Sequence, residues 1–142
     1  MILFPFDEAL TSLKKEEGWS ATAYKCASNR ITLGWGRNVD KNGGLGISKS
    51  EGEVLLRNDV ERCLVECKKA FSFFDDLTPN RQRALVEISF QLGTPSLKNF
   101  KKALGAVHRQ DYELASREFL NSKWAKQTPA RAKRMAKLIR YG

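Results

Sequence analysis

The sequence has few cysteines, one histidine and no long apolar run, and each scarcity excludes a class of protein. Its three cysteines, Cys26, Cys63 and Cys67, are unevenly spaced, which fits neither a disulfide framework nor a zinc site. No apolar stretch is long enough to span a bilayer. No basic residue precedes the apolar start, so we expect no signal peptide. We therefore expect a soluble chain without metal, cofactor or stable membrane insertion.

The length of the chain and the distribution of its charge limit the number of domains and the kind of partner. A chain of 142 residues fits one domain, or two small lobes that share a core. Residues 1–97 contain 13 basic and 13 acidic residues, whereas residues 98–142 contain 12 basic and 3 acidic ones. The whole net charge of +9 therefore lies in the last third. This asymmetry indicates a polyanionic partner (nucleic acid, an anionic membrane or a bacterial envelope) or a basic face that only keeps the protein soluble.

Helix signals dominate, and one short stretch has the character of strands. Asp7 is the expected N-cap of a first helix, which stops at Gly18. Apolar residues alternate with small or polar ones over residues 31–36, which predicts a strand. A second strand around residues 23–25 would precede it, with the turn near Ser28-Asn29. The Gly- and Asn-rich residues 38–46 indicate a loop.

A long helix follows this loop. Ser48 and Glu51 form a capping box, which opens a helix through roughly Phe71. Its buried side is expected to carry Val54, Leu55, Val60, Cys63, Leu64, Cys67 and Phe71.

Several shorter helices complete the chain. Thr78-Pro79 and Thr128-Pro129 each place a cap before a proline at the first helical position. Shorter helices are expected from Ser96 and from Asp111. The pattern predicts an α+β fold, mostly α: two lobes, with a small β-hairpin lobe, a long connecting helix and a helical C-terminal lobe. A cleft between such lobes would suit an extended polymer.

Glu17 is the first candidate for chemistry. It shares a helical face with Phe6, Leu10 and Leu13, so its side chain is expected to point inward. It also lies in the last turn, where the helix dipole presents partial negative charge. Both placements favour the protonated carboxyl that a general acid needs. A buried ion pair with an arginine would explain the same placement.

Thr32 and Cys26 lie in the hairpin. Strand alternation turns Thr32 to the face where Gly34 and Gly36 leave room for a ligand. Cys26 lies near the start of the hairpin and could face the same space. The alternative is that Thr32 only belongs to a tight hairpin and that Cys26 is a small apolar side chain packed within it.

These segments together resemble a known family. Glu17-Gly18, Tyr24, Cys26 and residues 31–36 (Ile-Thr-Leu-Gly-Trp-Gly) are similar to the catalytic segment of phage lysozymes related to the T-even lysozyme, glycoside hydrolase family 24. The resemblance continues through Phe90-Gln91-Leu92-Gly93 to the closing motif, and it covers about Leu13 to Arg140. The closing motif contains Ser122-Lys123-Trp124 and Gln127-Thr128-Pro129-Ala130-Arg131-Ala132-Lys133-Arg134.

The resemblance implies an enzyme that lyses bacterial cell walls by cleaving the β-1,4 bond between N-acetylmuramic acid and N-acetylglucosamine. Glu17 would donate the proton, and Cys26 and Thr32 would complete the catalytic triad. The second triad position is Asp or Cys in this family. Cys26 would therefore act as base, as nucleophile or as a group that positions the attacking water. The remaining implied roles are sugar binding by Phe90 and Gln91 and orientation of the acid by Arg131.

The resemblance also implies a single lysozyme domain over residues 1–142. Residues 13–47 would form the hairpin lobe, 48–71 the connecting helix, and 72–142 the helical lobe, with the N-terminal helix packed on it. Two departures from the family are Arg37, where many members have histidine, and Glu87, where members often have a neutral polar residue.

Partners and location follow from the same resemblance. The expected partners are bacterial peptidoglycan and anionic envelope components, without nucleic acid, and the expected state is a monomer. Accumulation in the host cytoplasm and release through a holin are expected, although a virion-associated or prophage-encoded lysozyme would have a similar sequence. The main alternative is a cationic protein that disrupts envelopes without catalysis. It is disfavoured because the apolar side of the last helix is narrow.

Overall fold

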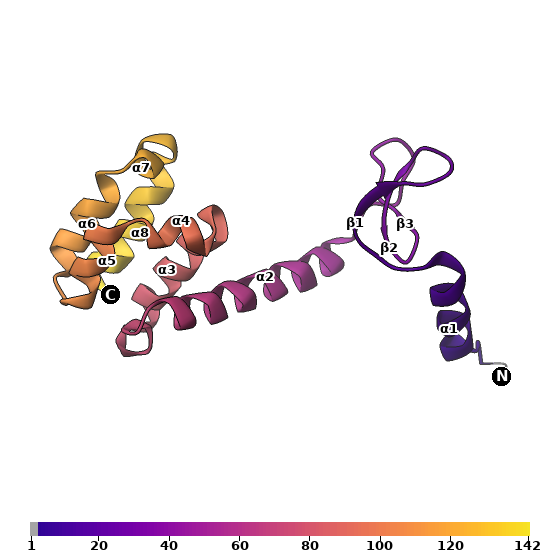
Figure 1. Cartoon of the computed structure of the whole chain (residues 1–142), viewed down its shortest axis with the longest axis horizontal. Helices are drawn as coiled ribbons and strands as arrows, with labels where there is room; N and C mark the ends of the chain where they lie inside the picture. The colour runs from indigo at the N-terminus through magenta and orange to yellow at the C-terminus, as the bar shows by residue number, and fades with distance from the viewer. Residues whose placement is uncertain (1–2) are drawn as a thin grey trace. The chain divides into compact units, whose positions relative to one another are not determined.

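The computed structural model describes residues 3–142, which divide into two compact units (Figure 1). The N-terminal unit is Met1–Glu53 and the C-terminal unit is Val54–Gly142. The described residues are mostly helical and contain one small antiparallel sheet, which confirms the α+β class. None of the helices formed by residues 3–142 has the length and apolar character needed to cross a membrane.

The first helix, α1 (Phe6–Glu17), begins earlier than predicted. Its N-cap is Pro5, so the prediction that Asp7 caps the helix is wrong. Asp7 lies in the first turn, where the helix dipole favours a carboxylate. The helix ends at Gly18, as predicted, and this glycine has a φ of 70°. Within this structure no residue of α1 is buried.

The predicted hairpin is confirmed and extended by a third strand. Tyr24 lies opposite Thr32, which in turn lies opposite Asn38. Trp35 and Gly36, predicted to continue the strand, form a tight turn instead. The strands, antiparallel in the order β1-β2-β3, are β1 (Ser20–Lys25), β2 (Ile31–Gly34) and β3 (Arg37–Asn38).

Asp40 ties the loop after β3 to the start of β2. One of its carboxylate oxygens accepts the backbone N–H of Ile31 at 2.8 Å, and the other accepts that of Asn42 at 2.8 Å. Arg30 lies 3.9 Å from the same carboxylate. These donors hold the pKa of Asp40 below its ordinary value, the Ile31 N–H contributing most.

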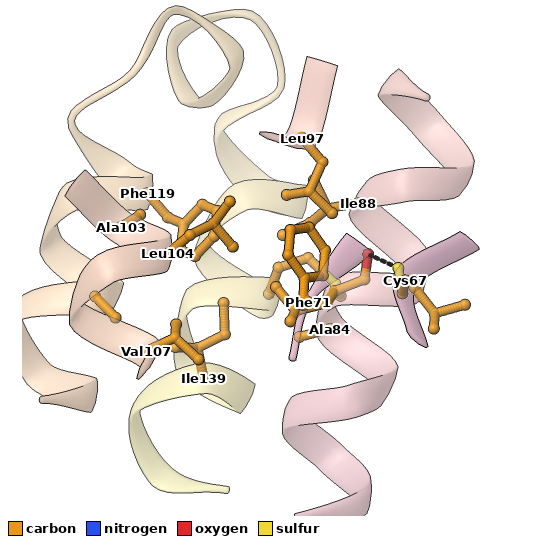
Figure 2. Packing of buried hydrophobic residues seen from close by; sticks show 14 of the residues in the cluster. Cys67, Phe71, Ala84, Ile88, Leu97, Ala103, Leu104, Val107, Phe119 and Ile139 are labelled. Atoms are coloured by element: carbon orange, nitrogen blue, oxygen red, sulfur yellow. Dashed lines mark hydrogen bonds between the residues drawn. The ribbon is translucent and has the colours of Figure 1, made fainter. Parts of the chain in front are cut away.

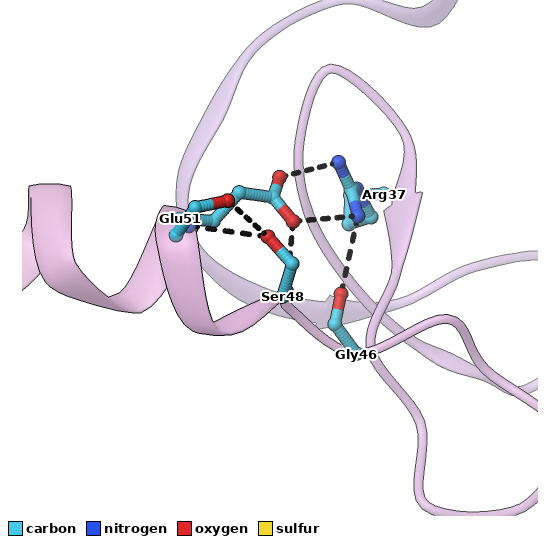
Figure 3. A network of polar contacts seen from close by, with 5 residues as sticks. Arg37, Gly46, Ser48 and Glu51 are labelled. Atoms are coloured by element: carbon cyan, nitrogen blue, oxygen red, sulfur yellow. Dashed lines mark hydrogen bonds and ion pairs between the residues drawn. The ribbon is translucent and has the colours of Figure 1, made fainter.

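The capping box at the start of α2 (Lys49–Ala70) is confirmed and joined by an arginine (Figure 3). Glu51 N–H donates to Ser48 Oγ at 3.1 Å, and Ser48 N–H donates to Glu51 Oε1 at 2.8 Å. Arg37 Nη2 lies 2.7 Å from Glu51 Oε2, and its Nη1 donates to the Gly46 carbonyl at 3.3 Å. The arginine that departs from the family pattern therefore fastens β3 to the first turn of α2.

Only the second half of the predicted buried side of α2 is confirmed. Cys63 and Cys67 are buried, as predicted, and so is Phe71 just beyond the helix. Val54, Leu55 and Val60 are exposed, because the hydrophobic core contacts α2 only from Cys63 onward. Helical periodicity identifies the apolar side but not how far along the helix a core extends.

The caps of the later helices are mostly as predicted. Thr78 Oγ1 accepts the N–H of Arg81 at 3.4 Å, and Asp111 caps α6. Thr128 is the N-cap residue of α8 (Pro129–Tyr141), as predicted, but its hydroxyl makes no cap hydrogen bond and donates back to the Trp124 carbonyl at 3.1 Å. The helix predicted from Ser96 already begins at residue 94. The elements are the 3-10 helix η1 (Phe74–Asp76) and the α-helices α3 (Pro79–Leu92), α4 (Thr94–Lys98), α5 (Lys101–His108), α6 (Tyr112–Leu120), α7 (Lys123–Gln127) and α8 (Pro129–Tyr141).

These helices enclose the core of the C-terminal unit (Figure 2). The thiol of Cys67 lies 3.9 Å from the Leu85 carbonyl oxygen, inside this core. The apolar residues of α8 are also used here, since Met135 and Ile139 are buried. Arg81 fixes the end of α8 by donating to the Ile139 carbonyl at 2.7 Å.

Replacing Asp40 should weaken the hairpin in a pH-dependent way. Because its pKa is lower in the folded chain, its stabilisation is present above the unfolded pKa of about 3.9 and is lost as pH falls through the folded value. We expect Asp40→Asn to lower the Tm at neutral pH, and the difference from wild type to shrink in acid. Thermal unfolding at a series of pH values measures this. Asp59→Asn, which breaks only an exposed ion pair with Arg62, is the control, and an equal effect from both changes would contradict the assignment.

Candidate active site

Glu17 lies at the end of α1 and rests on the turn between β2 and β3. A Cβ atom built on Gly36 would lie 2.6 Å from Glu17 Oε2 and 3.0 Å from its carboxyl carbon. Gly36 also has a φ of 73°, which side chains rarely adopt. The backbone conformation of the turn therefore favours glycine here, and the Glu17 carboxyl group lies close to it.

The expectation that Glu17 points inward is not met within the N-terminal unit. Its side chain is exposed, as are Phe6, Leu10 and Leu13 on the same helical face. The chain reverses at Gly18 into β1, and Glu17 lies beside the turn between β2 and β3.

A hollow of about 350 Å³ opens beside Glu17. Its walls include the indole of Trp19 and the phenol of Tyr24. Tyr24 stands opposite Thr32 in the strand register. The hairpin thus connects the hollow to the second group of predicted site residues.

Cys26 and Thr32 form that second group. The side chain of Cys26 is half-buried, and its pKa is lowered by the Arg30 backbone N–H first and by the Thr32 hydroxyl second, with Ser28 adding a smaller effect. Thr32 is only 4% exposed, so the prediction that it faces open space is wrong. Thr32 lies in β2, the central strand, which is paired with β1 on one side and β3 on the other.

The Thr32 hydroxyl has two neighbours but only one proton. It donates to the Arg30 carbonyl oxygen at 3.0 Å, and it is also the second-largest influence on the Cys26 thiol. With a neutral thiol the hydroxyl donates to the carbonyl, and ionisation of Cys26 makes donation to sulfur favourable.

Phe90 and Arg131 line one cavity of the C-terminal unit. This cavity has a volume of about 590 Å³ and is mostly apolar, with Glu87 also at its wall. Phe90 is 42% exposed, so it is not simply a core residue. Arg131 Nη2 donates to the Glu87 carbonyl at 3.5 Å. The predicted role of Arg131 in orienting the acid stays a prediction.

Gln91 is held by Trp124. The Trp124 indole N–H donates to Gln91 Oε1 at 2.9 Å, and Trp124 is buried, which confirms it as a core residue. Because the amide oxygen is occupied, the amide NH₂ of Gln91 remains to donate to a carbonyl such as that of an acetamido group. Sugar binding by Gln91 stays a prediction.

Two residues, Trp19 and Asp40, and the contact of Gly36 with Glu17 were not predicted from the sequence. Trp19 carries a signal that could have been noticed, since a large aromatic residue directly follows the helix stop. Asp40 and the contact of Gly36 with Glu17 carry none, because both depend on how the turn folds back. Within residues 3–142 no cluster of three or more His, Cys, Asp or Glu residues is arranged to hold a metal ion.

Alkylation should separate Cys26 from the two buried cysteines. Since the pKa of Cys26 is lowered, its reaction with iodoacetamide should reach half its maximal rate below the ordinary thiol value of about pH 8.5. Thr32→Val, which removes the hydroxyl donor, should move this midpoint upward. Burial raises the pKa of Cys67 to about 11, so Cys67 is the internal control in peptide mapping by mass spectrometry. A Cys26 midpoint equal to that of a free cysteine would contradict the hydrogen-bond account.

The chain is similar to proteins with lysozyme names. The phage lysozyme family model matches residues 14–140. "Probable T4-type lysozyme 2" of Dictyostelium discoideum is 30% identical over 156 residues, covering 92% of this chain and 92% of the relative. The endolysin of Acyrthosiphon pisum secondary endosymbiont phage 1 is 29% identical, covering 84% of this chain and 79% of that protein. The pre-baseplate central spike protein Gp5 of Enterobacteria phage T4 is also 29% identical, but only 19% of its length is covered. The chain therefore belongs to the phage lysozyme family, and its enzymatic class is that of a lysozyme, a hydrolase of peptidoglycan.

Proposed function

We propose that this lysozyme cleaves the β-1,4 bond between N-acetylmuramic acid and N-acetylglucosamine and thereby lyses bacterial cells, with Glu17 as the proton donor. The observation that carries the proposal is the placement of Glu17. Its carboxyl group rests on Gly36 at the edge of an open hollow, so a glycosidic oxygen can approach it.

The proposed reaction begins with proton transfer from Glu17 to the glycosidic oxygen. The bond to the leaving sugar breaks as positive charge develops on the remaining ring, and water supplies the new hydroxyl group. Two features of Glu17 support this step: its side chain is exposed within the N-terminal unit, and its carboxyl group lies beside Gly36 in the turn between β2 and β3.

Cys26 takes the position of a second carboxylate. We propose that Cys26 and Thr32 together position the attacking water, with the thiol or thiolate as acceptor. The lowered pKa of Cys26 supports this role because it increases the fraction of thiolate, a better acceptor than the thiol. The same donors also occupy sulfur lone pairs, which argues against a strongly nucleophilic thiolate.

The alternative of envelope disruption without catalysis has less support. A helix that inserts into a membrane surface needs a free apolar side. Met135 and Ile139 of α8 are buried, and Leu138 packs against the same core. The absence of a nucleic-acid partner, the monomeric state and holin-dependent release from the host cytoplasm stay predictions.

Glu17→Gln should abolish hydrolysis and leave the fold intact. Loss of general-acid catalysis should cost about 10²–10⁴-fold in kcat. Digestion of purified peptidoglycan and identification of the new reducing end measure both the activity and the bond cut. The matched control is Glu16→Gln, one residue earlier on the same helix and equally exposed, which should retain activity. A kcat of the Glu17→Gln protein close to that of the wild type would refute the assignment, and a reducing end on glucosamine would refute the proposed bond.

Cys26→Asp distinguishes the proposed role from a covalent one. A carboxylate can also orient water, so this variant should retain most of the wild-type kcat. Cys26→Ala, which removes the acceptor, should lose much more. If sulfur were an essential nucleophile, both changes would be severe, and the anomeric configuration of the first product would show retention.

A further inference from the structure

An exposed aromatic pair adjoins the hollow that contains Glu17. The ring centroids of Trp19 and Trp35 are 4.4 Å apart, with an interplanar angle of 52°. The exposed fractions are 62% for Trp19 and 47% for Trp35. Neither ring has a role in the proposed reaction. A tryptophan side chain has a large apolar surface, which a ligand can bury.

The position of Trp19 is defined by its contacts. It follows Glu17 by two residues, across the reversal at Gly18. Its ring lies near Gly34, where a built Cβ would be 3.8 Å from Trp19 Cζ3, and against Trp35. A ring held in this way loses little conformational entropy when a ligand binds to its free surface.

Trp19 and Glu17 belong to the same hollow. Ser20 and Tyr24, two residues with hydroxyl groups, also line it. An aromatic face with a few polar groups is the usual composition of a ligand site. A sugar polymer whose glycosidic oxygen reaches Glu17 therefore passes along a surface that Trp19 also lines.

A cation accompanies the aromatic pair. Lys14 Nζ lies 4.7 Å from the centroid of the Trp35 ring. The glycan of peptidoglycan carries peptide stems with free carboxylates, which this charge complements. An apolar protein segment would gain nothing from the lysine, so the charge favours a wall glycan as the occupant.

We propose that Trp19, held by Trp35, is a binding platform for the pyranose ring next to the bond that Glu17 protonates. The apolar C–H face of the sugar stacks on the indole, and Lys14 attracts the acidic stems. This inference rests on the proposed function, because it takes Glu17 as the acid. It adds a residue that determines glycan affinity and leaves the chemical step unchanged.

A binding experiment in the inactive background tests the platform directly. The probe is a soluble glycan strand with peptide stems, added to Glu17→Gln protein labelled with 5-fluorotryptophan. We expect the ¹⁹F resonances of Trp19 and Trp35, assigned through Trp19→Phe and Trp35→Phe, to shift on titration. In calorimetry Trp19→Ala should weaken the affinity about tenfold, as expected for a lost aromatic contact.

The matched control is Tyr141→Ala. Tyr141 is also exposed, at 69%, and also has a cation beside it, with Arg140 5.1 Å from its ring centroid. This variant should bind the glycan normally. Lys14→Gln should weaken binding of the strand with stems and leave binding of a strand stripped of its peptides unchanged.

Kinetics in the otherwise wild-type enzyme give an independent readout. Trp19→Ala should raise KM about tenfold with kcat within about twofold, and Trp19→Tyr should restore most of the affinity. Unchanged affinity in Trp19→Ala would overturn the proposal. A lower Tm with unchanged affinity would also overturn it, because the rings would then serve packing within the protein. If wild-type protein cleaved no peptidoglycan but Trp19 still bound the strand, the proposed function alone would fail.

Discussion

The geometry of the hairpin depends on the carboxylate of Asp40. It accepts one backbone N–H from the start of β2 and another from the loop beyond β3, so segments nine residues apart are tied through a single side chain. A sheet of three short strands has few ladder hydrogen bonds, and its central strand would otherwise be weakly fixed. The position of Thr32 and of the turn that contains Gly36 follows from this tie.

The turn between β2 and β3 lies against Glu17, the proposed acid. Glu17 lies at the end of one element and is seated by the backbone of another, so its position depends on the turn between β2 and β3. The surroundings of Cys26 differ from those of Glu17. Its thiol is surrounded by donors from its own hairpin, which lower its pKa without a nearby cation as the main cause. The site of the N-terminal unit therefore relies on backbone groups more than on ion pairs.

Local signals predicted much of the fold. The capping box of Ser48 and Glu51 and the cap at Thr78 were readable, because each involves residues close together in sequence. The exposure of Val54 and the burial of Thr32 were not readable. Periodicity says which side of an element is apolar or polar, whereas burial depends on which other element covers it.

For the site, the order of Glu17, Cys26 and Thr32 and the family that it indicates were determined by the sequence itself, since spacing along the chain is a local property. Tertiary structure alone decided that Glu17 rests on Gly36, that Asp40 holds the central strand, and that Trp19 meets Trp35 beside the hollow. Each of these contacts joins residues nine to nineteen positions apart. Such contacts arise only when a turn brings the two segments together, and no local pattern records the angle of that turn.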